Sequence, residues 1–129
     1  MDYDIAAMPL AATLGIEMVE ADKSHVVGRL TVREEITTGG HILHGGAYMV
    51  FADSLGAIGA VLNLRDGTRT TTLESKTNFL GSARVGDTIT GEATPLHVGR
   101  RSSVWQTRIT SAEGKLLAIV TQTQMTLEA

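Results

Sequence analysis

The alternation of apolar and polar side chains predicts extended strands along most of the chain. In Thr70–Leu80 the alternation places Leu73, Ser75, Thr77 and Phe79 on one face and Thr72, Glu74, Lys76 and Asn78 on the other. Short polar connections separate the later segments, which predicts hairpins and therefore an antiparallel sheet. The six predicted strands are Ile16–Ala21, His25–Arg33, Thr70–Leu80, Asp87–His97, Arg101–Thr110 and Leu116–Leu127.

One long segment breaks the alternation. Residues Gly46–Leu64 are apolar nearly all round, which predicts a helix covered on most of its sides. A short helix within Ile5–Leu14, ended by Gly15, precedes the strands. One long helix among six strands is an α+β pattern rather than a βαβ alternation. Because an antiparallel sheet covers only one side of such a helix, we expect a second subunit on the other side.

The apolar segment also raises the question of a membrane helix. Asp53 lies in its middle, where a charge is costly in lipid, and strand-like segments flank it. The core helix of a soluble protein is therefore favoured, with no membrane partner. The first residues carry two acids and no basic region, so no secretory signal is predicted. Together with the absence of cysteine, this indicates a cytoplasmic protein.

Composition narrows the function classes. The length of 129 residues predicts one domain, residues 1–129. The absence of Cys excludes disulfides, thiolate metal sites and Cys nucleophiles, and His spacing typical of a zinc site is missing. A net charge of −3 argues against a nucleic-acid partner. Residues 54–129 hold 8 basic and 6 acidic side chains, which suits either a phosphorylated ligand or an ordinary mixed surface.

The candidate chemistry gathers at the start of the long helix. His44, Gly45 and Gly46 precede its apolar run, and Asp53 is the ionisable residue within it. A helix N-terminus offers unpaired N–H groups to a developing oxyanion, and glycines let a ligand approach the main chain. The structural alternatives are a paired carboxylate at Asp53, a capping histidine at His44 and tight packing of the glycines.

Helix geometry adds an expectation about subunits. Gly45 and Asp53 are 8 residues apart, about 12 Å along a helix axis. A carbonyl under attack must lie about 3 Å from both its oxyanion donor and the attacking group. One helix cannot supply both groups to the same carbonyl. Two antiparallel helices of a two-fold dimer can, because each N-terminus then faces the middle of the other helix.

The run from Gly40 to Asp53, GHILHGGAYMVFAD, resembles the hallmark of hotdog-fold acyl-CoA thioesterases of the phenylacetate-degradation and 4-hydroxybenzoyl-CoA types. The segments Thr72–Leu80 and His97–Gln106 are similar to the same family. The resemblance implies a curved antiparallel sheet around one long helix. It implies hydrolysis of an acyl- or aryl-CoA thioester to free acid and CoA, with no cofactor besides the CoA of the substrate. It also implies a homodimer with shared active sites, alone or as a dimer of dimers.

The resemblance also implies roles for single residues. Asp53 matches an Asp or Glu that acts as nucleophile or as general base on water. The N–H of Gly45 would polarise the thioester carbonyl, with Gly46 beside it in the substrate-binding turn. His44 would help to seat the substrate or product. Thr72 matches a position where relatives place a Ser or Thr that orients water.

The chain departs from the pattern in the loop before the helix. Six residues before His44, relatives often carry an Asn or Gln that assists at the thioester or the water. Thr38 holds that position here, and its hydroxyl is shorter. A shift of the loop alignment brings His41 into the same role.

Basic residues at strand ends are candidates for the CoA phosphates. We expect Arg84, Arg100 or Arg101 to contact them, and the Arg100–Arg101 pair in its Gly-containing turn is favoured. Plain surface arginines are the alternative.

Two other functions remain as alternatives. A hotdog hydratase or dehydratase needs an Asp/His pair suited to a double bond, which the His-Gly-Gly-then-Asp arrangement fits poorly. A non-catalytic acyl-CoA binding or sensing module gains little from a carboxylate facing a thioester, so Asp53 weighs against it.

Overall fold

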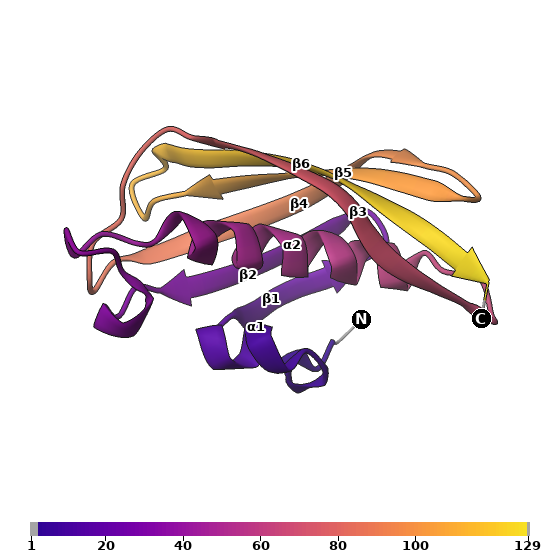
Figure 1. The fold of residues 1–129 in the computed structure, drawn as a ribbon, viewed down its shortest axis with the longest axis horizontal. Helices are drawn as coiled ribbons and strands as arrows, with labels where there is room; N and C mark the ends of the chain where they lie inside the picture. The colour runs from indigo at the N-terminus through magenta and orange to yellow at the C-terminus, as the bar shows by residue number, and fades with distance from the viewer. Residues whose placement is uncertain (1–2, 129) are drawn as a thin grey trace.

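The computed structural model describes residues 3–128, which form one antiparallel sheet curved around one long helix (Figure 1). The sheet has six strands in the order β1-β2-β4-β5-β6-β3. This arrangement confirms the α+β prediction. The strands are β1 (Glu17–Asp22), β2 (His25–Thr31), β3 (Thr68–Phe79), β4 (Thr88–Val98), β5 (Ser102–Thr110) and β6 (Leu116–Glu128).

The long helix α2 (Gly45–Leu62) lies along the concave face of the sheet (Figure 1). Phe51, Leu55 and Ile58 are fully buried and recur at helical spacing, so one side of α2 faces the strands. Trp105 and Ile89 of the sheet complete this core. Among the described residues, α2 is the one helix long and apolar enough to cross a membrane. A core helix packed against a sheet meets the same criterion.

The N-terminal helix is interrupted, in contrast to the single element expected from the sequence. A 3-10 turn η1 (Ile5–Ala7) is followed by α1 (Pro9–Leu14). Pro9 has no N–H and a fixed φ, so it starts a helix well and does not continue one. Gly15 ends α1 in the left-handed region at φ 97°, as predicted.

The predicted faces of β3 are wrong in its first half. The pairing with β6 shifts register between Thr72 and Glu74, so that Leu73 is an extra residue. As a result Thr72 lies on the inner side with Ser75, while Leu73 is 65% exposed. Alternation extrapolated through a bulge assigns every residue on one side of it to the wrong face.

The less buried side of α2 is largely apolar. Met49 and Val61 are each 40% exposed, and Val50, Asp53 and Ala57 are half-buried. These five residues recur at the spacing of one helix face, which we call the outer stripe of α2. Asp53 is the one charged member of the outer stripe.

Candidate active site

The N-terminus of α2 presents a free backbone donor. His44 is the N-cap residue, and its Nδ1 accepts a hydrogen bond from the N–H of Gly46 at 2.8 Å. Because Nδ1 accepts this hydrogen bond, the neutral tautomer of His44 is assigned with its proton on Nε2. Within residues 3–128, no protein acceptor takes the N–H of Gly45. The capping interpretation of His44 is confirmed by this hydrogen bond, and its role in seating substrate stays a prediction.

Asp53 is held by two uncharged side chains from different strands. Thr72 Oγ1 of β3 donates to Asp53 Oδ1 at 2.6 Å. Gln122 Nε2 of β6 donates to the same oxygen at 3.0 Å. Among the described residues, no Lys, Arg or His forms an ion pair with Asp53. The structural alternative of a carboxylate paired with arginine is therefore not what the fold provides.

Two mainly apolar cavities meet at Asp53. One of about 290 Å³ lies between α2 and β3 and is lined by Met49, Val50, Asp53, Thr72 and Ser75. The other, also of about 290 Å³, lies between α1 and α2 and is lined by Met8, Pro9, Leu10, Ala11, Val50, Asp53 and Ser54. A half-buried carboxylate beside apolar space suits an acyl group with one reacting end.

A third cavity, of about 220 Å³, lies at the N-terminus of α2. It is lined by Thr38, Ile42, Leu43, Gly45, Tyr48, Phe79, Gly81 and Ser82. Burial raises the pKa of Tyr48, so its hydroxyl stays protonated and donates to the carbonyl of Gly81 at 3.4 Å. Gly45 therefore borders a cavity whose other lining residues are uncharged and partly apolar.

Thr38 and His41, the two candidates for the role of the Asn or Gln of relatives, lie in different surroundings in the loop before α2. Thr38 lines the third cavity with Gly45, and its Oγ1 accepts a hydrogen bond from the N–H of Gly40 at 3.2 Å. The His41 side chain is 70% exposed, and its Nδ1 lies 2.6 Å from Glu34 Oε1. The fold therefore brings Thr38, rather than His41, to the helix N-terminus.

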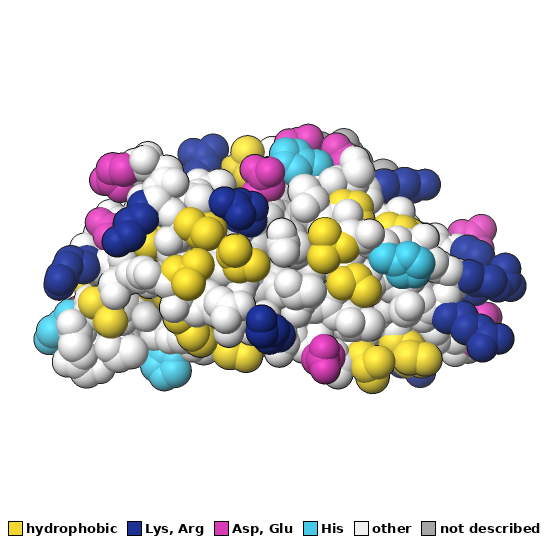
Figure 2. Space-filling view, turned by 90° about the horizontal axis from the view of Figure 1, so that it is seen from above, with side chains coloured by type: hydrophobic (Ala, Val, Ile, Leu, Met, Phe, Trp, Pro, Cys, Tyr) yellow, Lys and Arg dark blue, Asp and Glu magenta, His cyan; other side chains and the backbone are white. Residues whose placement is uncertain are grey.

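The three candidate arginines lie at opposite ends of α2. Arg84 pairs through its backbone with Ile42, in the loop before Gly45. Arg100 and Arg101 lie in the β4–β5 turn, where the carbonyl of Arg100 accepts a hydrogen bond from Arg65 just beyond the end of α2. Figure 2 shows Lys and Arg side chains at the right-hand end of the molecule, where Figure 1 places this turn. All three arginines are exposed.

Two residues that contact the candidate site were missed in the sequence. Gln122 and Gln124 of β6 are each 1% exposed and connect to the Asp53 site. They continue an inward series of apolar positions in which Ala118 and Val120 are fully buried. Two glutamines at inward positions of an alternating strand are the signal that would have found them.

Metal ligands are not gathered in this region. In residues 3–128, no group of three or more His, Asp or Glu side chains is arranged to hold a metal ion.

Comparison with known proteins defines the family. Residues 40–118 match the Thioesterase superfamily, and the chain belongs to it. The 1,4-dihydroxy-2-naphthoyl-CoA hydrolase of Listeria monocytogenes is 35% identical over 112 residues, which cover 87% of this chain and 90% of that protein. The enzyme of the same name from Escherichia coli is 39% identical over 75 residues, 58% of this chain and 54% of that protein. The chain is thus a thioester hydrolase of this family.

Solved structures support the same fold. AziG of S. sahachiroi superposes with a TM-score of 0.90 at 27% identity, covering 94% of this chain and 98% of that one. A thioesterase mutant from Pseudomonas aeruginosa gives 0.90 at 25% identity, with coverages of 100% and 97%. The PaaI protein of E. coli gives 0.86 at 24% identity, covering 94% and 86%. The resemblance to hotdog thioesterases stated from the motif is confirmed.

Proposed function

We propose that the protein hydrolyses acyl-CoA thioesters, with Asp53 of one subunit and the Gly45 N–H of its partner acting on the same carbonyl. The single observation that carries the proposal is Asp53 itself. It is a half-buried carboxylate without a cationic partner in residues 3–128, held by neutral donors beside two apolar cavities. The names of the relatives support a CoA thioester as substrate.

Two chemical routes fit this geometry. In the first, Asp53 attacks the thioester carbonyl carbon, the C–S bond breaks, CoA leaves as thiolate, and water then hydrolyses the acyl–aspartyl anhydride. In the second, Asp53 takes a proton from water as the water attacks the carbonyl, and the thiolate leaves with a proton from solvent. In both routes the carbonyl oxygen becomes an oxyanion that the Gly45 N–H stabilises. His44 contributes a second donor, Nε2–H, to the substrate or product.

The shared site is supported by the outer stripe of α2. Gly45 and Asp53 lie in the same helix about 12 Å apart along its axis, so one subunit does not bring them to one carbonyl. In an antiparallel pair of α2 helices, Gly45 faces Asp53 of the partner when the two-fold axis passes the residue midway between them, Met49. Met49 is 40% exposed and belongs to the outer stripe, whose apolar residues a partner helix would cover.

A cysteine cross-link tests this axis. The chain has no Cys, so Met49→Cys introduces one thiol per subunit, which faces its own copy across the two-fold axis. Mild oxidation should convert most of the protein to a covalent dimer, seen on a non-reducing gel. Val61→Cys is the matched control, equally exposed on the same stripe but 12 residues from the axis. Equal cross-linking of both variants, or of neither, would refute the register.

Complementation tests whether the site is shared. Gly45→Pro removes the N–H at the first helical position, where proline is tolerated after the extended His44 (φ −64°, ψ 138°). Asp53→Asn removes the carboxylate. Each variant alone should be nearly inactive. Co-expression gives about half hybrid dimers, each with one intact site, so about a quarter of wild-type activity returns.

A control variant separates the lost donor from the added bulk. A Cβ at position 45 would lie 3.2 Å from the Phe79 ring, which is 52% exposed and must move by a few tenths of an ångström to make room. Gly45→Ala adds this Cβ and keeps the N–H, so it should retain most activity. If hybrid dimers form and no activity returns, the site lies within one subunit.

The CoA phosphates provide a further test. If Arg100 and Arg101 bind them, alanine at both positions should raise KM for acyl-CoA several-fold with little change in kcat. The effect should disappear with a truncated thioester that lacks the nucleotide. Arg84→Ala is the companion variant, because Arg84 lies at the opposite end of α2. A KM increase confined to Arg84→Ala would move the phosphate site to that end.

The acyl group is addressed by a panel of substrates. Apolar cavities beside Asp53 and relatives named for a naphthoyl-CoA substrate favour an aromatic acyl group. Release of free CoA thiol from aryl-, short-chain and long-chain acyl-CoAs measures the preference. A higher kcat/KM for a long-chain acyl-CoA would contradict the aromatic assignment.

A further inference from the structure

The inner face of β6 carries two buried amides where apolar side chains would pack. Gln122 and Gln124 are each 1% exposed and follow the fully buried Ala118 and Val120. Burying an amide costs free energy unless its polar atoms are hydrogen-bonded. Apolar residues at these two positions would stabilise the sheet more, so stability alone does not explain the glutamines.

The hydrogen bonds from Gln124 to Asp53 run in one direction. Thr70 Oγ1 lies 3.0 Å from Gln124 Oε1 and 3.2 Å from the carbonyl of Met125, and its single proton serves one of these two acceptors at a time. The orientation of the Gln124 amide follows instead from Asp53: a carboxylate only accepts hydrogen bonds, so Thr72 donates to it and Gln124 presents Nε2 to Thr72. Gln124 Nε2 then donates to Thr72 Oγ1 at 2.6 Å. Because the Thr72 hydroxyl accepts this hydrogen bond, its own proton is directed to Asp53 Oδ1 at 2.6 Å. The Thr72 oxygen keeps one lone pair that can still accept a hydrogen bond from water.

Gln122 holds the same carboxylate oxygen from the other side. Its Nε2 donates to Asp53 Oδ1 at 3.0 Å and to the Asp53 carbonyl at 3.4 Å. Its Oε1 is buried and has no partner within residues 3–128. The opposite orientation of the amide would place Oε1 against the carboxylate. Asp53 therefore determines the orientation of Gln122, even though one acceptor is left without a hydrogen bond.

The helix makes room for Gln122 at Gly56. A Cβ on Gly56 would lie 2.3 Å from Gln122 Oε1 and 2.8 Å from its Nε2. Glycine is less favourable than alanine inside a helix, so the glycine at this position is explained by the space that it leaves for Gln122. Gly59, in the same helix, makes similar room for Trp105, whose ring would lie 2.5 Å from a Cβ there.

We propose that Gln122 and Gln124 are positioning residues for Asp53. Gln122 donates to Oδ1 directly, in the space that Gly56 leaves, and Gln124 acts through Thr72. The two hydrogen bonds on Oδ1 leave Oδ2 as the reacting oxygen. In residues 3–128 no protein donor contacts Oδ2, whereas Oδ1 accepts two hydrogen bonds. Asp53 lines both cavities, so a carboxylate fixed through Oδ1 turns its other oxygen towards a bound thioester or water. This inference rests on the proposed function, in which Asp53 attacks the thioester or activates water.

The first experiment compares two glycine substitutions in α2. Gly56→Ala pushes the Gln122 amide away from Asp53, so kcat per folded enzyme should fall about 10- to 100-fold with KM nearly unchanged. Gly59→Ala is the matched control, with the same substitution in the same helix and a clash of similar closeness against Trp105. It should lower the melting temperature and leave kcat within about twofold of wild type. Equal kcat in the two variants would overturn the proposal.

The second experiment asks whether the added Cβ acts through Gln122. Gln122→Ala removes the donor and empties the space that a Cβ at position 56 would enter. Gln122→Ala alone should lower kcat by a factor similar to that of Gly56→Ala. Adding Gly56→Ala to this variant should then change kcat by less than about twofold, because no amide is left to displace. If Gly56→Ala lowers kcat as much in this background as in wild type, the helix substitution acts on its own and the positioning role is refuted.

Gln122→Leu and Gln124→Leu keep the inference testable where alanine destabilises the sheet. Both keep much of the side-chain volume and remove the amide donor. Each should lower kcat rather than raise KM. Wild-type kcat in both variants would refute the role of the glutamines.

Failure of this inference is distinct from failure of the proposed function. If Asp53→Asn is inactive while all the glutamine and Gly56 variants match wild type, Asp53 acts without this positioning and only the inference falls. If Asp53→Asn retains wild-type turnover, the proposed function falls first, and the inference with it.

Discussion

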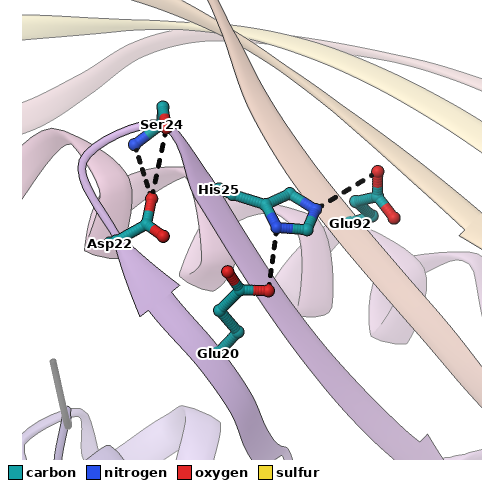
Figure 3. Close-up of polar contacts among 5 residues, drawn as sticks. All are labelled: Glu20, Asp22, Ser24, His25 and Glu92. Carbon is teal, nitrogen blue, oxygen red and sulfur yellow. Dashed lines mark hydrogen bonds and ion pairs between the residues drawn. The ribbon is translucent and has the colours of Figure 1, made fainter.

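Two regions of the molecule each hold one ionisable side chain between two partners, and they do so in opposite ways. His25 of β2 lies between Glu20 of β1 and Glu92 of β4, with nitrogen–oxygen distances of 2.9 and 3.3 Å (Figure 3). These side chains are 33%, 47% and 52% exposed. Asp53 is half-buried like His25, but its partners Thr72 and Gln122 carry no charge.

The difference teaches what each arrangement is suited for. Opposite charges near water stabilise each other weakly, and the attraction depends on pH and salt. Neutral donors hold a carboxylate in one orientation without a cation to balance its charge. The cluster around His25 therefore connects three neighbouring strands, whereas the contacts of Asp53 hold a carboxylate in place without neutralising its charge.

The pKa values of the exposed cluster follow from its charges. Burial acts to lower the pKa of His25, but the hydrogen bond to Glu92 and the charge of Glu20 outweigh it, so the pKa is raised. At the β1–β2 turn, the hydrogen bond from the Ser24 N–H lowers the pKa of Asp22 (Figure 3). Both shifts favour the charged forms, as expected for groups with charged or polar partners near solvent.

The largest expected effect comes from removing the charge of Asp53. Asp53→Asn should lower kcat by at least about two orders of magnitude, because the reaction loses its nucleophile or base. The fold should persist, since the change removes a half-buried charge and keeps the shape. Thiol release and a thermal melt measure the two quantities. Near-normal turnover would make Asp53 a structural residue like those around His25.

An intermediate effect is expected from the neutral donor on β3. Thr72→Val keeps the shape and removes the hydroxyl, so kcat should fall about tenfold with little change in KM. Thr72→Ser keeps the hydroxyl and should retain most of the activity. Steady-state kinetics on both variants give the comparison. Equal loss in the two variants would show that packing of the methyl group, rather than the hydrogen bond, matters at this position.

The smallest effect is expected at His25, and it should appear in stability alone. A raised pKa means that His25 stabilises the folded state fully below its unfolded pKa, and that this contribution is lost as pH rises through the folded pKa. His25→Gln should therefore cost up to about 1 kcal/mol near pH 6, and almost nothing at about pH 9. Urea denaturation at both pH values measures it. A cost that grows with pH would reverse the sign, and a change in kcat would break the separation of the two regions.

Much of the fold could be predicted because its signals are local. The apolar run before and after Asp53 indicated the central helix, and α2 is found as Gly45–Leu62. Alternation indicated six strands, and all six are present. The bulge at Leu73 could not be predicted, because a strand with one extra residue still alternates on either side of it.

The site was predicted only in part, because its contacts are not local. His44, Gly45 and Asp53 were proposed from their positions along one helix, and the structure places them there, with His44 as the N-cap of α2. Thr72 hydrogen-bonds Gln124 across 52 residues of sequence, through the pairing of β3 with β6. No pattern within either strand specifies that pairing, and glutamine on a strand usually indicates a surface position.

The bulge in β3 also has a consequence for the gene. Leu73 and Glu74 are two exposed residues in succession, between the inward Thr72 and Ser75. In-frame loss of codon 73 would leave a strictly alternating strand, with Thr72 and Ser75 still on the inner side. Loss of codon 76 would instead break the alternation, because it turns the residues beyond Ser75 to the opposite face. Among related genes, single-codon deletions should therefore be tolerated at Leu73 and removed by selection a few codons later.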